Sequence, residues 1–116
     1  MKGLGPAPRL GFALRGLLDA WQTEATFRLQ VAAAIGVVGV LVWLRPSLLW
    51  VAVVVVLIGA VLAAELLNTA LEHMLDAVHP EHNELVRVAK DCAAAAVLVL
   101  STAAAVVFVL MLLEVR

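Results

Sequence analysis

The sequence has little of several residue types, and each shortage excludes a class of protein. Its single cysteine, Cys92, cannot form an internal disulfide and has no second thiol for a zinc site. Eight lysines and arginines stand against nine acidic residues, so the chain lacks the basic excess that binds nucleic acid. It has no Walker-type loop or kinase glycine-rich loop, which excludes the nucleotide folds of soluble kinases. Its first residues lack the apolar core and cleavage site of a signal peptide, so we expect them to remain in the mature protein.

Apolar residues, in contrast, dominate the composition. They make up 65% of the 116 residues, and the mean hydropathy is +1.08. A soluble domain is only about half apolar. Both values therefore predict a membrane protein, and the length favours a single domain covering residues 1–116.

The N-terminal region has the pattern of a helix that lies in the membrane surface. Over residues 9–23 an apolar stripe faces a polar stripe at helical spacing. The apolar stripe contains Leu10, Leu14, Leu17 and Trp21, and the polar stripe contains Arg15, Asp19 and Gln22. Phe12 falls on the polar side, which is either an irregularity of the pattern or an aromatic ring placed to stack on a base.

Three long apolar segments follow and predict an all-α membrane protein. We expect membrane-spanning helices at about residues 27–44, 48–78 and 86–113, because a span needs about 20 apolar residues. The proline-containing segments 45–47 and 79–83 read as the turns between them. The middle helix is longer than a span requires, so its last turns should reach the edge of the membrane.

Those last turns carry a stripe of polar side chains. Glu65, Asn68, Glu72 and Asp76 fall on one line of a helix at about 100° per residue. Leucines, alanines and a methionine cover the other faces. Acidic groups on an otherwise apolar helix need a partner or a function.

Short turns between three spans place the polar groups on one side of the membrane. The start of the first span, the end of the second and the start of the third should share that side. Most basic residues lie there, and the positive-inside rule makes it cytoplasmic. The chain would thereby gather side chains from three helices at one interface, namely Glu24, Arg28, Glu65, Asn68, Glu72, Asp76, Lys90 and Asp91.

This combination of groups suits phosphoryl transfer to an alcohol. Mg²⁺ is held by one or two carboxylates together with phosphate oxygens, and Lys90 and Arg28 could bind phosphate. A carboxylate close to hydrocarbon is poorly solvated and could accept the proton of a hydroxyl. A metal, a phosphate clamp and a base together describe a kinase reaction.

Two other functions remain open from the residues alone. A small channel could use intramembrane carboxylates, although a pore would need polar groups through its whole depth. A membrane adaptor could use an acidic face to bind a partner.

Single residues also have simpler interpretations. Arg28 could equally anchor at lipid headgroups. The spacing of the histidines matches no zinc motif, so we interpret His73, His79 and His82 as surface residues.

Three blocks of the sequence resemble one family. AELLNTALEHMLDAV, residues 64–78, is similar to the second-span motif of the small prokaryotic diacylglycerol kinase family, which includes the undecaprenol kinases. VAKDCAAAAVLV, residues 88–99, resembles the family's Lys-Asp block, and WQTEATFRLQ, residues 21–30, resembles its Glu and Phe-Arg block. The blocks have the family's order and intervals and cover nearly the whole chain.

The resemblance implies a homotrimer with sites at subunit contacts, ATP as a substrate and Mg²⁺ as a cofactor. It implies Glu65 as the general base and Glu24 and Glu72 as metal ligands. The nucleotide contacts that it implies are Phe12, Glu24, Asn68, Glu72, Glu81, His82, Asn83, Lys90 and Asp91. The lipid or phosphate contacts are Arg9, Trp21, Arg28, Glu65 and Ala94.

The lipid alcohol stays open between diacylglycerol and undecaprenol. Glu81, His82 and Asn83 differ from the diacylglycerol-specific pattern, Ala94 stands where that pattern has a serine, and Leu29 where it has a polar residue. The alanine-rich start of the third span resembles the undecaprenol kinase branch. We expect the protein in the bacterial inner membrane, with its active site facing the cytoplasm.

Overall fold

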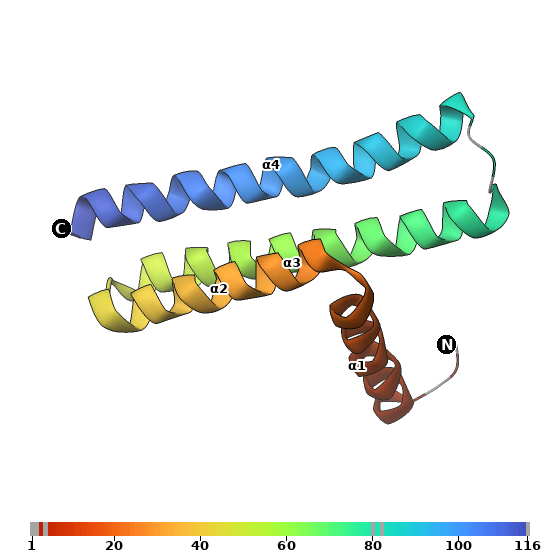
Figure 1. Cartoon of the computed structure of the whole chain (residues 1–116). Helices are drawn as coiled ribbons and strands as arrows, with labels where there is room; N and C mark the ends of the chain where they lie inside the picture. The colour runs from red at the N-terminus through yellow and green to blue at the C-terminus, as the bar shows by residue number, and fades with distance from the viewer. Residues whose placement is uncertain (1–2, 4, 80, 82, 116) are drawn as a thin grey trace.

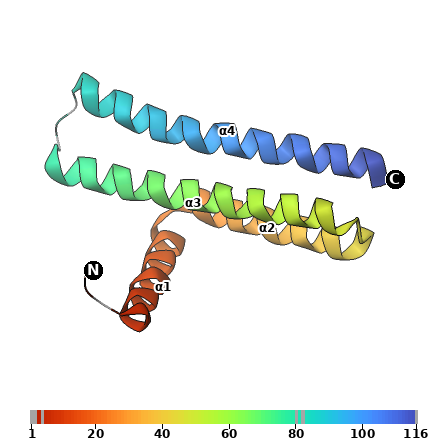
Figure 2. The same ribbon diagram turned by 180° about the vertical axis from the view of Figure 1, so that it is seen from behind.

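All regular structure in the described part of the chain is helical. The computed structural model describes residues 3, 5–79, 81 and 83–115. Its helices are α1 (Pro6–Thr23), α2 (Ala25–Leu44), α3 (Leu48–Val78) and α4 (Glu84–Val115). α2, α3 and α4 lie side by side along their lengths, and α1 projects from them at a steep angle (Figure 1). Figure 2 shows the same arrangement from behind.

The three long helices have the character of membrane spans. α2, α3 and α4 are each long and apolar enough to cross a membrane. Their large side chains stay mostly exposed in a single chain, as expected of surfaces that meet lipid or other helices. The prediction of an all-α chain with three apolar helices of spanning length is confirmed.

Three helices begin earlier than the sequence pattern indicated, and the first span, α2, does so at Ala25 instead of near residue 27. α1 begins at Pro6 instead of near residue 9, because proline is well tolerated in the first helical turn, where the backbone N–H has no partner. α4 begins at Glu84 instead of near residue 86. Asn83 Oδ1 accepts a hydrogen bond from the N–H of Val86 at 2.9 Å, which is the geometry of an N-cap.

Residue 24 forms the corner between α1 and α2. Glu24 has extended backbone angles, φ −117° and ψ 107°, and its N–H donates to the carbonyl of Ala20 at 2.9 Å. Arg28 Nη1 on α2 donates to the carbonyl of Trp21 on α1 at 2.6 Å, and this second bond also connects the two helices. The corner directs the Glu24 side chain toward the end of α3.

The opposite corner joins α2 to α3 through a tight turn. Arg45 caps α2 in the left-handed region at φ 51°, a conformation that residues other than glycine seldom adopt. Pro46 follows and disfavours a further helical turn. Close to this end, Leu41, Val54 and Met111 form the buried cluster of the three-helix packing, and Trp50 Nε1 donates to Glu114 Oε2 at 2.9 Å.

Candidate active site

One face of α3 changes from apolar to polar at Glu65. The buried residues of this helix are Val54, Val61 and Glu65, and helical spacing puts Asn68 and Glu72 on the same face. Glu65 is only 4% exposed, and it is the one charged side chain that the described part of the chain buries. A carboxylate at this boundary can meet both a water-soluble reagent and a group that comes from the membrane.

Asn68 and Glu72 form an acceptor-rich pair just beyond Glu65. Asn68 Nδ2 donates to Glu72 Oε1 at 3.3 Å, which fixes the orientation of the amide. The other amide atom, Asn68 Oδ1, is buried and has no hydrogen-bond partner among the described residues. An unpaired buried carbonyl costs about 1–3 kcal/mol, so this oxygen is suited to a donor or a cation that a ligand brings.

Glu24 reaches the same end of α3 from the α1–α2 corner. Its Oε1 lies 3.5 Å from Nε2 of His73, the residue that follows Glu72 in the sequence. The Glu24 side chain is 24% exposed, and that of His73 is 61% exposed. The fold therefore brings Glu24 beside the polar turns of α3, as the sequence predicted, and adds His73 as its neighbour.

Lys90 joins α4 to the end of the polar stripe. Its Nζ donates to Asp76 Oδ1 at 2.6 Å. The ammonium group is thereby fixed at the polar end of α3, as expected from the short loop between α3 and α4. Asp91 takes another direction, because Arg87 Nη1 donates to its Oδ2 at 2.6 Å, and the same guanidinium binds Glu84. Lys90 therefore contacts α3, whereas the adjacent Asp91 contacts a residue of its own helix.

The remaining candidates lie on α1, α2 and α4, and most of them are exposed. The guanidinium carbon of Arg15 lies 5.6 Å from the centre of the Phe12 ring, within the range of a cation–π contact. Arg28 holds the α1–α2 corner, as described above. Three further candidates are exposed on their helices, namely Arg9, Trp21 and Ala94.

The three nucleotide contacts predicted in the loop between α3 and α4 are Glu81, His82 and Asn83. Glu81 is exposed, and Asn83 uses its side-chain oxygen to cap α4. His82 lies outside the described residues. The structure therefore gives Asn83 a helix-capping contact that the sequence comparison did not indicate.

The oxygen atoms at this end are of the chemical kind that Mg²⁺ would share with phosphate. The described residues include no group of three or more His, Cys, Asp and Glu side chains placed to hold a metal. Mg²⁺ usually takes one or two carboxylates, waters and phosphate oxygens. Glu24, Glu72 and the unpaired Asn68 Oδ1 supply donors of that kind.

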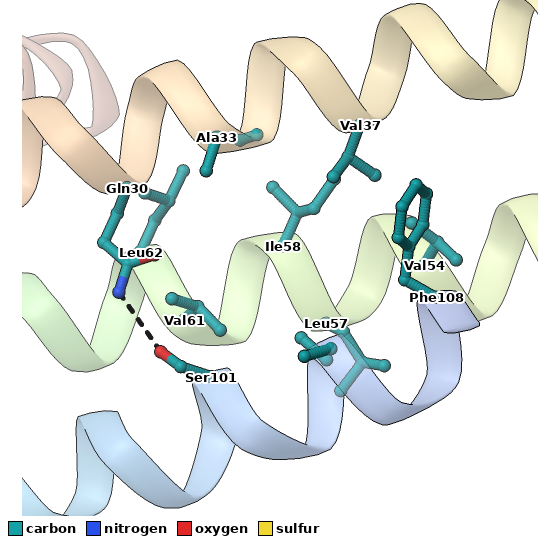
Figure 3. A pocket seen from close by; sticks show the side chains of 13 residues that line it. Gln30, Ala33, Val37, Val54, Leu57, Ile58, Val61, Leu62, Ser101 and Phe108 are labelled. Carbon is teal, nitrogen blue, oxygen red and sulfur yellow. Dashed lines mark hydrogen bonds between the residues drawn. The ribbon is translucent and has the colours of Figure 1, made fainter. Parts of the chain in front are cut away.

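An apolar pocket occupies the membrane half of the same α3 face. Its volume is about 250 Å³, and Figure 3 shows it between α2, α3 and α4. The lining is hydrophobic except for Gln30 and Ser101, whose side chains are joined by a hydrogen bond of 3.1 Å. The complete lining consists of Gln30, Ala33, Ala34, Val37, Val54, Leu57, Ile58, Val61, Leu62, Ser101, Ala104, Ala105 and Phe108.

Sequence reasoning missed two residues of this region. His73 is exposed, as the sequence predicted, but its contact with Glu24 was not predicted, because only the corner between α1 and α2 makes that contact possible. Gln30 was not singled out, although a lone amide in an apolar span is a recognisable signal. Ser101 Oγ on α4 accepts the hydrogen bond from Gln30.

Comparison with known proteins points to one family. The family model described as prokaryotic diacylglycerol kinase matches residues 11–112. An undecaprenol kinase of Bacillus subtilis is 38% identical over 101 residues, which cover 85% of this chain and 80% of that protein. A diacylglycerol kinase of Synechocystis is 37% identical over 83% of this chain and 55% of its own length. A diacylglycerol kinase of Escherichia coli K12 is 31% identical over 88% of this chain and 84% of its own length.

Proposed function

Because the chain belongs to the prokaryotic diacylglycerol kinase family, we propose that it transfers the γ-phosphate of ATP to the hydroxyl group of a membrane lipid. The observation that carries this proposal is the position of Glu65. Its buried carboxylate lies where an apolar pocket meets a polar stripe on one helix face. A lipid hydroxyl and a nucleotide phosphate can approach such a place from opposite sides.

Glu65 acts as the general base in this proposal. Its carboxylate accepts the proton of the lipid hydroxyl as the oxygen attacks the γ-phosphorus, and the bond from that phosphorus to the ADP oxygen breaks. A positioned base contributes about 10²–10⁴-fold to a rate. The product is a lipid phosphate.

Glu24, Glu72 and Asn68 bind the metal–nucleotide complex. Bound Mg²⁺ would neutralise charge on the phosphates, and Glu24 and Glu72 supply its carboxylate ligands. Lys90 lies beside the stripe and can exchange Asp76 for a phosphate oxygen. Asp91, Phe12 and the loop residues Glu81, His82 and Asn83 complete the nucleotide contacts. Arg9, Trp21, Arg28 and Ala94 would lie toward the lipid or its phosphate.

The setting of the reaction is the cytoplasmic face of the bacterial inner membrane. The basic residues gathered at this end of the spans support that orientation. α1 lies along the membrane surface, with the aromatic ring of Phe12 toward the nucleotide. The many exposed apolar side chains support self-association, and we propose a homotrimer with sites at subunit contacts.

A phosphate-transfer assay tests the function. Purified protein in detergent should transfer radiolabelled phosphate from ATP to diacylglycerol or undecaprenol in the presence of Mg²⁺. The matched inactive protein is Glu65→Gln, which keeps the size of the side chain. A channel or an adaptor would transfer no phosphate to either lipid, and that result would reject the proposal.

A further inference from the structure

A single polar pair interrupts the apolar pocket. Gln30 Nε2 on α2 donates to Ser101 Oγ on α4 at 3.1 Å. Figure 3 shows the bond reaching across α3 beside Val61 and Leu62, with Phe108 toward the other end of the pocket. Both polar side chains are half-buried. A glutamine inside a membrane span is costly, so its place in this pocket calls for a physical explanation.

The pair leaves hydrogen-bonding capacity free for a ligand. A glutamine amide has two N–H donors and one carbonyl acceptor, and the bond to Ser101 uses one donor. No further bond of Gln30 is found in the described part of the chain. In hydrocarbon no water satisfies the second N–H. An acceptor on a molecule that enters the pocket would satisfy it.

The pair lies close to the carboxylate that is proposed to activate the lipid. Val61, which lines the pocket, precedes Glu65 by four residues on the same face of α3. That spacing is one helical turn, or about 6 Å along the axis. A lipid with its hydroxyl at Glu65 therefore has the next part of its structure level with Gln30 and its chain among the apolar side chains.

The pocket has room for a segment of that chain. Its volume is about 250 Å³, whereas an apolar cavity of about 150 Å³ already holds benzene. The side chains beyond the Gln30–Ser101 pair are all hydrophobic and contribute no further polar recognition. Chemical selection among lipid alcohols within this pocket must therefore take place at the pair.

We propose that Gln30, positioned by Ser101, donates its second amide N–H to an ester carbonyl of the lipid substrate and so selects a glycerol diester. This inference rests on the proposed function. In a diacylglycerol an ester group occupies the carbon next to the one that bears the free hydroxyl. A polyprenol has only hydrocarbon there, so it would leave the amide N–H unsatisfied.

An ester-to-ether comparison tests the inference directly. The substrates are dioleoylglycerol, the dialkyl diether of glycerol with the same chains, and undecaprenol, each presented in the same detergent. The diether keeps the hydroxyl and the chains but lacks the carbonyl oxygens. The wild-type protein should show kcat/KM about tenfold higher for the diester than for the diether, the factor expected from one hydrogen bond.

Variants locate the effect at the pair. Gln30→Met preserves the length of the side chain and removes the donor, and it should reduce the ester-to-ether ratio to near one through the KM for the diester. Ser101→Ala should reduce the ratio partly. The control is Thr102→Ala, which removes the neighbouring hydroxyl. Thr102 is exposed and lies outside the lining of this pocket. It should keep the wild-type ratio.

Each contrary result has a distinct meaning. An ester-to-ether ratio near one in the wild-type protein would overturn the inference without any variant, as would a preference for undecaprenol. If Gln30→Met lowered kcat/KM equally for all lipids and raised the KM for ATP, the bond would only connect α2 to α4. Absence of transfer to every lipid would instead reject the kinase function itself.

Discussion

Lys90 Nζ and Asp76 Oδ1 meet at 2.6 Å, and this contact joins the first turns of α4 to the last turn of α3. The contact keeps a cation beside the acidic stripe. The Lys90 side chain is 30% exposed and that of Asp76 is 63% exposed, so the pair is screened by solvent and contributes little to stability. We therefore expect Lys90 to contribute to the binding of ATP and not to the stability of the fold.

Lys90→Gln should raise the KM for ATP at least tenfold, because a hydrogen bond to a charged phosphate is worth about 1.5–3 kcal/mol. Asp76→Asn keeps the lysine and should change that KM by less than about threefold. Steady-state kinetics with saturating lipid provide both values. Equal losses in the two variants would mean that the ion pair itself, and not a phosphate contact, is what ATP binding requires.

Glu65→Gln and Glu72→Gln should both lose activity for different reasons. Glu65→Gln removes the proton acceptor, so kcat should fall by about 10²–10⁴-fold while ATP binding remains. Glu72→Gln removes a metal ligand beside the unpaired Asn68 oxygen, so the KM for Mg²⁺-ATP should rise and excess Mg²⁺ should restore part of the rate.

The measurement is a titration of Mg²⁺ and ATP against each variant with saturating lipid. Gel filtration should first confirm that both variants keep the oligomeric state of the wild-type protein. Rescue of Glu65→Gln by Mg²⁺, together with no rescue of Glu72→Gln, would reverse the two roles assigned here.

Phe12→Ala should weaken ATP without affecting the lipid. Phe12 is 38% exposed, and stacking of a base on an aromatic side chain is worth about 1–3 kcal/mol, so we expect the KM for ATP to rise about tenfold. Leu10→Ala on the same helix, where the side chain is 61% exposed, is the matched control. A similar rise in the KM for the lipid would show that Phe12 only packs in the membrane surface.

Two inactive variants should complement each other if subunits share sites. Glu24→Ala and Glu65→Ala, each inactive alone, would form some complete sites in mixed oligomers and regain part of the activity. Co-purification with two different tags confirms mixing. Lasting inactivity of verified mixed oligomers would instead indicate that the Glu24–His73 contact within one chain marks a site that each chain completes alone.

The sequence by itself determined the helices and the polar stripe. Long apolar segments can cross a membrane only as helices or closed barrels, and their length together with the turn at Pro46 placed the helix limits closely. Helical spacing alone put Glu65, Asn68 and Glu72 on one face, because that relation depends only on the period of the helix. The motif in this stripe, together with the blocks at residues 21–30 and 88–99, indicated the family.

The tertiary structure decided the specific side-chain contacts between helices. The contact of Glu24 with His73 depends on the angle of the α1–α2 corner, and the Gln30–Ser101 bond depends on how α2 and α4 lie on α3. Neither angle nor packing can be read from the period of a single helix, because lipid-facing and helix-facing surfaces of a span are equally apolar. The sequence did indicate a lipid substrate. The pocket and its one polar pair depend on helix packing, so only the folded chain shows them.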